Sequence, residues 1–403
     1  MEKEKIREVI VEKKVGFSTL EVIIIIIVAI AFGAILGSVI SYREDVKELE
    51  FSYGDLGEVV RTYKNLTNDY YEKVDKEKLT NAAIKGMVES LGDPYTVYID
   101  NEKAEVFNQR VTGEYYGIGA VVGRVDKKII VAGVIKDSPA EEAGIKSGDE
   151  IIKIDDTVIT EKMDTSEVTE LLKNDKKVKT TIKINRNDEE KDIVIEKKEI
   201  DIPSVGSEVM EKDGKKIGYL DLSIFAANTY EQFKKELNGL EKEGITDLII
   251  DVRNNPGGHL DQVSKILSTF VPKGEVIYQI KAKGKTKKTF SNNKKAKKYK
   301  IAVLVNGDSA SASEILAAGL KESADAKIVG VKTFGKGTVQ KAYSLVSGAV
   351  VKYTYEEWLT PKGTSINKKG ITPDVSVELD ESYYKNPTLE KDNQLQKAIE
   401  TMK

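Results

Sequence analysis

An uncharged stretch near the N-terminus constrains this chain of 403 residues more than any other feature. Every residue from Val22 to Ile40 is apolar or small, and the run is about as long as a helix needs to cross a bilayer. Four lysines and one arginine precede it, whereas only Arg43 and Lys47 follow closely. Because positive charge favours the cytoplasmic side, we predict a single-pass membrane protein with residues 1–21 inside and everything after Ser41 outside.

Two other fates of this N-terminus stay open. A signal peptide could be cleaved at Ala29-Ile30-Ala31, but the apolar run continues well past that point and favours a retained anchor. Residues 13–21 also resemble the processing site of type IV pilin-like proteins, with the cut between Gly16 and Phe17 and with Glu21 at the fifth mature position. A glutamate at the cytoplasmic edge of a span costs little energy, so the uncleaved anchor remains our prediction.

Composition excludes several kinds of chemistry. Charged residues make up 32 % of the chain, yet the net charge is only −3, which gives no case for nucleic-acid binding. There is no cysteine, so disulfides and thiolate catalysis are excluded. The single histidine, His259, cannot form a zinc site of the Cys and His type by itself. A Ser-His-Asp triad would have to use this residue.

A short apolar strand in the second half of the chain leads into a run of serines. Ile301 to Val305 has the length and the β-branched content of a buried strand, and Asn306-Gly307-Asp308 interrupts it. Helical spacing of apolar residues begins at Ser311. Ser311 is therefore expected beside free backbone N–H groups at the positive end of a helix dipole. This position suits a nucleophile whose transition state develops negative charge, although a simple helix cap is the ordinary alternative.

A second strand leads into a lysine that is flanked by glycines. Lys327 to Val331 is the strand, and Phe334-Gly335-Lys336-Gly337 follows it. Glycines allow the backbone to pack closely around the stem of Lys336 and to exclude water, and a desolvated lysine can act as a general base near neutral pH. Strands and amphipathic helices alternate from Lys216 onward, which predicts an α/β domain whose strand ends meet at one sheet edge. The pattern therefore predicts a pair of Ser311 and Lys336.

Three blocks of the sequence resemble the signatures of the carboxyl-terminal processing proteases, also called tail-specific proteases. This family consists of PDZ-containing serine–lysine peptidases. The blocks are Ser309 to Glu314, Phe334 to Gln340 and Asp251 to Gly258, and the resemblance covers roughly Leu91 to Val377.

The resemblance implies a role for each residue of the site. Ser311 would be the nucleophile, Lys336 the base, and Gln340 the residue that orients the base. The oxyanion hole would consist of the backbone N–H groups of Gly257 and Ala312. All five positions agree with the family pattern.

His259 is the competing base, because it directly follows Gly257-Gly258. That position is not catalytic in the resembling family, and no third group that would orient an imidazole is identifiable. We therefore interpret His259 as a bystander. Asp251 and Arg253 are predicted to form a buried ion pair that holds this turn, and the serines on either side of Ser311 are predicted to support the site.

Residues 107–199 resemble a PDZ domain. Tyr116-Gly117-Ile118-Gly119 resembles the loop whose backbone N–H groups bind the terminal carboxylate of a peptide, and residues 137–154 make the match specific. We expect positive φ at Gly117 and Gly119, so that successive N–H groups point at one carboxylate. The domain is predicted to hold substrate tails and to gate access to the protease.

Three further segments are predicted more coarsely. Residues 45–106 are charged with apolar positions at helical spacing, which predicts two or three helices, one of them from Lys78 to Leu91. Lys281 to Lys300 contains ten lysines and is predicted to form an exposed hairpin with solvated lysines. The tail from Pro387 to Lys403 is predicted to form a short helix packed on the body or on a partner.

The predicted architecture is α+β and multidomain. The predicted segments are a cytoplasmic N-terminus (1–21), a transmembrane anchor (22–40), a helical region (45–106), a PDZ domain (107–199), a serine–lysine protease core (200–378) and a C-terminal tail (379–403). The resemblance implies a crotonase-like sandwich for the core. It also implies that the helical region caps the protease and can promote a homodimer.

These features together predict a membrane-anchored serine endopeptidase. It would cleave protein or peptide substrates near a free C-terminus, outside the cytoplasmic membrane, without a cofactor. The alternative is an inactive, membrane-anchored PDZ scaffold that binds protein C-termini. The intact serine, lysine and glutamine of the signature blocks argue against the scaffold.

Overall fold

The computed structural model forms two compact units, Met1–Met87 and Val88–Lys403. The basic residues that precede the apolar run, and the pilin-like cleavage site, lie outside the described part of the chain. The residues that the structure describes are 19–173, 177–385 and 387–402.

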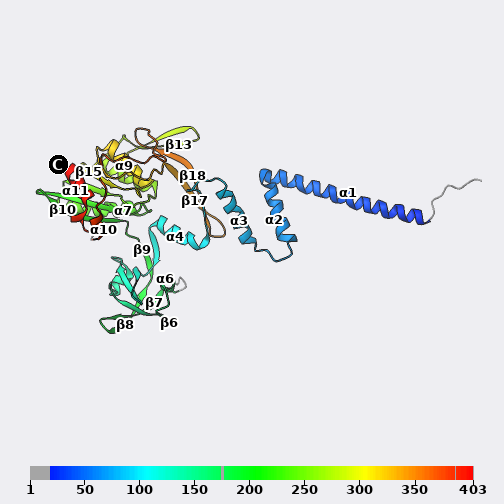
Figure 1. Ribbon diagram of the computed structural model, residues 1–403, viewed down its shortest axis with the longest axis horizontal. Helices are drawn as coiled ribbons and strands as arrows, with labels where there is room; N and C mark the ends of the chain where they lie inside the picture. The colour runs from blue at the N-terminus through cyan, green and yellow to red at the C-terminus, as the bar shows by residue number, and fades with distance from the viewer. Residues whose placement is uncertain (1–18, 174–176, 386, 403) are drawn as a thin grey trace, which may run out of the picture. The chain divides into compact units, whose positions relative to one another are not determined.

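The predicted span lies within one long helix, α1 (Thr19–Tyr53; Figure 1). Its portion Thr19–Ile40 is long and apolar enough to cross a membrane, and its side chains are exposed. A helix satisfies its backbone hydrogen bonds internally, as the interior of a bilayer requires. Length and composition fit an anchor and a signal sequence equally.

Helices follow in the predicted helical region. A 3₁₀ turn (Gly54–Leu56) and α2 (Gly57–Asp69) precede α3 (Lys76–Glu89), which ends before Gly92-Asp93-Pro94 as predicted. The carboxylate of Asp75 accepts a hydrogen bond from the Lys78 nitrogen at 3.0 Å and caps the start of α3. The prediction of helices is thus confirmed. The helix predicted from Lys78 to Leu91 begins and ends two residues earlier, as α3.

A small β-rich body occupies the middle of the chain. Its sheet has the order β3-β4-β5-β7-β8, so β3 is an edge strand. Ile129, Val131, Ile154, Ile182 and Ile184 lie in its buried core. The elements are β3 (Ala120–Val125), β4 (Lys128–Val134), α5 (Pro139–Glu142), β5 (Glu150–Ile154), β6 (Thr157–Val158), α6 (Thr165–Lys173), β7 (Lys179–Arg186) and β8 (Glu189–Glu196).

Two strands lead into and out of this body. β2 (Glu114–Gly117) and β9 (Lys198–Asp201) pair antiparallel, with Glu114 opposite Asp201. Before β2, helix α4 (Asn101–Thr112) is capped at its start by Asp100 and ends at Gly113, whose φ is 77°.

A mostly parallel sheet forms the centre of the region after the small β-rich body. The order is β10-β11-β12-β15-β16-β19, in which only β10 runs antiparallel to its neighbour. Parallel strands place their carboxyl ends at one edge, so the turns after β12, β15 and β16 lie together. The strands are β10 (Val205–Lys212), β11 (Lys215–Leu222), β12 (Asp247–Asp251), β15 (Lys300–Val305), β16 (Lys327–Gly330) and β19 (Val375–Ser376).

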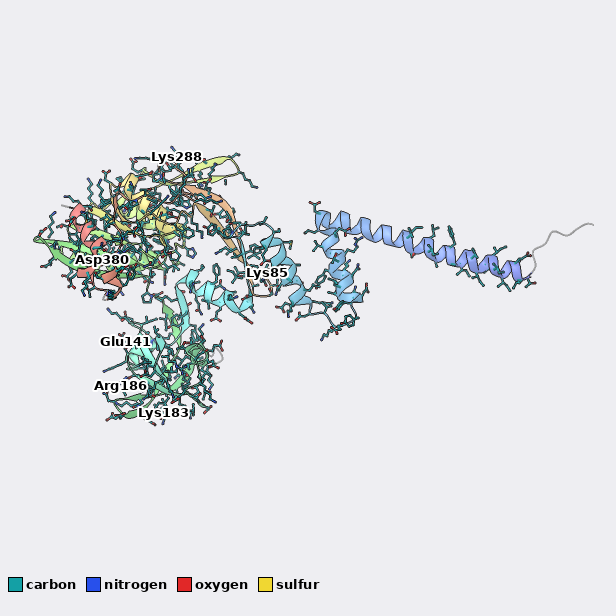
Figure 2. All side chains as sticks on the ribbon, in the orientation of Figure 1. Lys85, Glu141, Lys183, Arg186, Lys288 and Asp380 are labelled. Atoms are coloured by element: carbon teal, nitrogen blue, oxygen red, sulfur yellow. The ribbon has the colours of Figure 1, made fainter. Side chains whose placement is uncertain are left out.

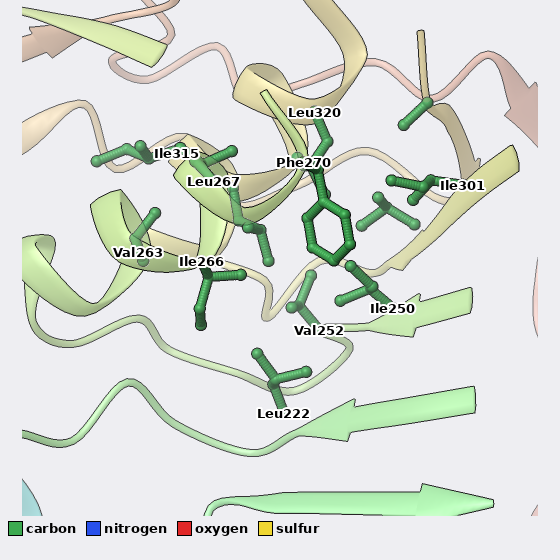
Figure 3. Close-up of a cluster of buried hydrophobic side chains, with 14 of the residues drawn as sticks. Leu222, Ile250, Val252, Val263, Ile266, Leu267, Phe270, Ile301, Ile315 and Leu320 are labelled. Carbon is green, nitrogen blue, oxygen red and sulfur yellow. The ribbon is translucent and has the colours of Figure 1, made fainter. Parts of the chain in front are cut away.

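Helices bury both faces of this sheet, which explains why the central strands β12, β15 and β16 carry almost continuous apolar runs. On one face, α7 (Thr229–Lys242), α8 (Leu260–Phe270) and α9 (Ala312–Ser323) share a hydrophobic core with side chains such as Ile250 and Ile301 (Figure 3). On the other face, α11 (Asn393–Thr401) packs against side chains that include Ile249 and Leu304. The predicted tail helix is therefore confirmed and packs on the body. The short helices α10 (Glu381–Lys385) and Leu389–Lys391 precede it.

A second sheet carries the predicted lysine-rich hairpin. Its order is β1-β18-β13-β14, with β17 also paired to β18. The turn of the hairpin β13–β14 and most of β14, with Lys288, are exposed (Figure 2), whereas Ile277, Tyr278 and Gln279 of β13 are buried. Not every lysine of the segment is solvated, because Lys297 forms an ion pair with Glu241 at 2.6 Å. The strands are β1 (Val97–Ile99), β13 (Val276–Ala282), β14 (Lys285–Phe290), β17 (Thr338–Ser344) and β18 (Val350–Leu359).

Candidate active site

Ser311 lies at the turn between β15 and α9, as predicted. Its φ is 54°, in a region that residues other than glycine rarely adopt, and its side chain is half-buried. The carboxylate of Glu314 accepts a hydrogen bond from the Ser311 nitrogen at 2.9 Å, and Ser311 accepts one from the Ile315 nitrogen at 3.0 Å. Such strained backbone persists only where the surroundings hold it, and it clusters at functional sites.

The flanking serines brace this turn. The hydroxyl of Ser309 donates to the Val252 carbonyl at 2.7 Å, and the hydroxyl of Ser313 donates to the Asn255 carbonyl at 2.8 Å. Both serines are fully buried. Each hydroxyl therefore fixes the serine turn to the turn that follows β12.

Lys336 lies in the loop after β16. Burial, and after it the charge of Lys352, lowers the pKa of Lys336 to about 8, as the predicted desolvation requires. The flanking glycines are needed for this close packing. A Cβ on Gly335, whose φ is 92°, would lie 2.8 Å from the nitrogen of Gly370, and a Cβ on Gly337 would lie 2.7 Å from the nitrogen of Asn367.

One buried carboxylate joins the serine turn to the lysine loop. Glu314 is fully buried. One of its oxygens accepts from the nitrogens of Ser311 and Lys336, both at 2.9 Å. The other accepts from the hydroxyl of Thr333 at 2.6 Å and the nitrogen of Gly335 at 2.8 Å. Burial raises the pKa of Glu314, although these four hydrogen bonds oppose the rise.

Our interpretation of the sequence gave Glu314 no function of its own. Its spacing from Ser311 is that of a capping box, in which a glutamate binds the backbone N–H of the cap residue. That signal identifies the helix start. The contacts of Glu314 with the lysine loop appear only when the ends of β15 and β16 lie side by side.

The turn after β12 reaches the start of α9. Gly257 has a φ of 101°, and a Cβ there would lie 2.9 Å from both the Ala312 nitrogen and the Ser311 Cβ. The two predicted oxyanion-hole residues are therefore neighbours. In this conformation the Gly257 nitrogen donates to Oδ1 of Asn255 at 2.9 Å.

Gln340 lies on β17. Its Nε2 donates to the hydroxyls of Thr338 at 3.0 Å and Thr354 at 3.2 Å. The same two threonines line a cavity of about 430 Å³ between the turn of β13–β14 and the end of β18. No hydrogen bond joins Gln340 to Lys336 among the described residues, so its orienting role stays a prediction.

His259 is engaged away from the serine. Its Nε2 lies 2.9 Å from the Val111 carbonyl oxygen, which can only accept, so this nitrogen carries a proton. Its Nδ1 lies 3.8 Å from the carboxylate of Asp261. This geometry agrees with a bystander role.

The predicted ion pair of Asp251 and Arg253 is confirmed at 2.5 Å. The pair belongs to a network that was not predicted, because Arg253 also binds Asp392 at 2.6 Å and Gln394 at 2.9 Å. Burial acts against the charge of Arg253, but these partners outweigh it and raise its pKa. The network ties the turn after β12 to the start of α11.

The PDZ loop is partly as predicted. Gly119 has a φ of 86°, and a Cβ there would lie 2.3 Å from the Cβ of Ser138. The expectation of positive φ at Gly117 is wrong, because Gly117 is the last residue of β2. Glycine is needed there for another reason: a Cβ would lie 2.6 Å from the ring of Tyr115.

The described residues contain no group of three or more His, Cys, Asp or Glu side chains that could hold a metal ion. The arrangement offers a hydroxyl at a helix start, a lysine with a depressed pKa and two neighbouring backbone N–H groups. These are the parts that acyl transfer needs.

Comparison with known proteins identifies the family. Residues 216–377 match Peptidase family S41, residues 37–103 match the N-terminal domain of the activating protease CtpB, and residues 130–186 match a PDZ domain. The photosystem II D1 C-terminal processing protease has 25 % sequence identity and a TM-score of 0.47, over 84 % of this chain and 92 % of that one.

Two relatives from Bacillus subtilis (strain 168) are similar over most of the chain. Carboxy-terminal processing protease CtpB is 40 % identical over 335 residues, which cover 82 % of this chain and 70 % of that protein. Carboxy-terminal processing protease CtpA is 39 % identical over 334 residues, which cover 82 % and 71 %. The chain therefore belongs to the carboxy-terminal processing proteases of peptidase family S41, and it is a serine peptidase.

Proposed function

We propose that this chain is a membrane-anchored endopeptidase that cleaves proteins near their C-terminus, with Ser311 as nucleophile and Lys336 as base. One observation carries the proposal: the backbone nitrogens of both residues lie 2.9 Å from the same oxygen of Glu314. Because both nitrogens bind one oxygen, the two backbones lie close together, and the long side chain of Lys336 can extend to the Ser311 hydroxyl. The depressed pKa of Lys336 is the second requirement for a general base.

The reaction is acyl transfer in two steps. Neutral Lys336 takes the proton of the Ser311 hydroxyl as its oxygen attacks the scissile carbonyl, and the ammonium then passes this proton to the leaving amine. Water hydrolyses the acyl-enzyme with Lys336 again as base. With a pKa of about 8, roughly a tenth of Lys336 is neutral at pH 7, whereas an ordinary lysine would be almost wholly charged.

To form the oxyanion hole and to orient the base, two groups have to change their hydrogen-bond partners. The N–H of Gly257 has to leave Asn255 for the developing oxyanion, which is the stronger acceptor because it carries charge. Ala312 provides the second N–H. Gln340 likewise has to leave its threonine partners to reach Lys336. We infer that bound substrate favours both exchanges and completes the site.

Substrate tails enter through the PDZ domain. The edge strand β3 is free to pair with an extended peptide, and Tyr116-Gly117-Ile118-Gly119 would hold its terminal carboxylate. If the domain also gates the protease, deletion of residues 107–199 should release unregulated cleavage of unstructured peptides. If it only holds the tail, the deletion should abolish cleavage.

The anchor places the protease outside the cytoplasmic membrane. In this proposal residues 22–40 stay in the membrane and residues 1–21 stay inside. Protease added to intact spheroplasts should digest the large domain, and full protection would reverse the topology. The homodimer, the crotonase-like sandwich and the limits 45–106, 107–199 and 200–378 remain predictions from the sequence.

The test of the dyad uses the full chain in detergent micelles and a peptide with a free apolar C-terminus. Ser311→Ala and Lys336→Ala should each abolish cleavage without changing the thermal unfolding curve. His259→Ala should retain most of the activity. Near wild-type turnover in Lys336→Ala would exclude the dyad, and loss of turnover in a well-folded His259→Ala would make the histidine the base.

A further inference from the structure

A tyrosine outside the three signature blocks lies against the proposed base. Tyr95 follows Gly92-Asp93-Pro94 and precedes β1. The ammonium nitrogen of Lys336 lies 4.7 Å from the centre of the Tyr95 ring. Among the described residues the Lys336 ammonium has no hydrogen bond or ion pair, so this ring face is its partner in the present conformation.

The position of Tyr95 is fixed by its neighbours. The carboxylate of Asp93 accepts from the Tyr95 nitrogen at 3.1 Å and from the Thr96 hydroxyl at 2.6 Å. That hydroxyl accepts in turn from the Thr354 nitrogen at 3.0 Å, and the Thr354 hydroxyl accepts from Gln340 at 3.2 Å. Tyr95 is thus held by the same strand, β18, that holds the residue predicted to orient the base.

Charged groups face Lys336 from three other parts of the fold. Lys352 on β18 adds to burial in lowering the pKa of Lys336, whereas Asp93 before β1 and Glu314 on α9 act to raise it. The electron-rich face of Tyr95 carries no charge but attracts a cation, most strongly where water is excluded. The ring therefore acts in the same direction as the two carboxylates: it favours the ammonium form of Lys336.

We propose that Tyr95 is a positioning residue for Lys336: its ring seats the ammonium that Lys336 becomes when it takes the proton of Ser311. The inference rests on the proposed function. During acylation the O–H bond of Ser311 breaks as its oxygen bonds to the carbonyl carbon, and the proton goes to the lone pair of Lys336. The ammonium later gives this proton to the leaving amine. Tyr95 exchanges no proton or electron and stabilises the lysine only while it is charged.

The electron density of the ring can be lowered while its shape is kept. In the full chain in detergent, position 95 is changed to a trifluorinated phenylalanine, and Tyr95→Phe and Tyr95→Leu are made beside it. Tyr384→Leu, at an exposed tyrosine of α10, is the matched control. The first measurement is the acid limb of kcat/KM against pH, which reports the pKa of the base in the free enzyme.

The second measurement needs no turnover. Trace acetic anhydride acetylates only neutral amines, so the acetylation of Lys336 against pH, read by mass spectrometry, gives its pKa directly. Each variant at position 95 is also prepared with Ser311→Ala for this purpose. A folded variant that does not cleave peptides therefore still gives an answer.

Tyr95→Phe should leave the pKa of Lys336 close to the wild-type value. The trifluorinated ring and Tyr95→Leu should lower it by about half to one unit, the size of a partly buried cation–π contact, and move the acid limb to lower pH. Both changes should also reduce kcat several-fold, since the ammonium of Lys336 loses the ring face that positions it. Tyr384→Leu should change neither quantity.

Three results would overturn the inference in distinguishable ways. An unchanged pKa of Lys336 with the trifluorinated ring, while Lys336→Ala is inactive, would refute the role of Tyr95 and leave the dyad standing. An active Lys336→Ala enzyme would refute the proposed function, and with it the role of Tyr95 in positioning Lys336. A loss of activity without a shift of the limb would show that Tyr95 is only structural.

Discussion

Two substitutions remove the carboxylate of Glu314, and they differ in how many hydrogen bonds they break. Glu314→Gln keeps the shape of the side chain but replaces one oxygen by an amide NH₂ group. If the remaining oxygen accepts from Ser311 and Lys336, the NH₂ can donate to the Thr333 hydroxyl. The N–H of Gly335 is then the one backbone donor that loses its acceptor, and the O–H of Thr333 has to turn away from residue 314. Glu314→Ala removes the acceptor for all four donors.

The two costs follow from these contacts. One buried, unpaired donor costs about 1–3 kcal/mol, so Glu314→Gln should lower the thermal midpoint modestly. Glu314→Ala leaves three backbone N–H groups unpaired and should cost at least about 3 kcal/mol, a large part of the net stability of a typical domain. It also frees the serine turn from the lysine loop, and a displacement of about 1 Å at a reacting group costs roughly a hundredfold in rate.

We therefore expect Glu314→Gln to remain within about tenfold of the wild-type kcat/KM and Glu314→Ala to lose about a hundredfold or more. Loss of the negative charge should also lower the pKa of Lys336 in Glu314→Gln and move the acid limb to lower pH, because Glu314 acts to raise that pKa. Peptide cleavage against pH and thermal unfolding measure these effects, with exposed Glu208→Gln and Glu208→Ala as matched controls. A folded Glu314→Ala enzyme with wild-type kcat/KM would refute the reasoning.

Three further predictions concern other parts of the site. Lys352→Met should raise the pKa of Lys336, because a like charge is removed, and should shift the acid limb of kcat/KM to higher pH; a shift to lower pH would contradict the assignment. Gly257→Ala should lower kcat by about a hundredfold or more in a folded enzyme, since its Cβ would lie 2.9 Å from the Ala312 nitrogen; unchanged kcat would exclude this turn from the oxyanion hole. Gly119→Val should sharply reduce cleavage of a peptide with a free C-terminus, and amidation should do the same to the wild-type enzyme; equal rates for free and amidated peptides would end the proposal of carboxylate recognition.

The sequence was sufficient to predict those elements whose structure depends on the spacing of neighbouring residues. The strand from Ile301 and the helix after Ser311 follow from short apolar runs and from helical periodicity, and both lie within a residue or two of the prediction. Strand–helix alternation also predicted that separate turns meet at one sheet edge. The desolvation of Lys336 could be predicted because adjacent glycines reveal close packing of the backbone.

Contacts between distant segments were not predictable in this way. Tyr95 precedes Lys336 by more than two hundred residues, and nothing in its own neighbourhood indicates an aromatic partner for a lysine. The four donors of Glu314 come together only after two loops have folded against each other. Gly117 was misjudged because a glycine needed for space and a glycine needed for positive φ look the same in a sequence.

The β2–β9 ribbon has a consequence for how such proteases can diversify. The chain enters the small β-rich body at Glu114 and leaves it at Asp201, and these two residues are paired across the ribbon. A module whose two ends are adjacent can be replaced by another without altering the spacing of the host chain on either side. If this body holds substrate tails as we propose, exchange of the whole body would change which tails are bound and would leave the residues around Ser311 and Lys336 unchanged.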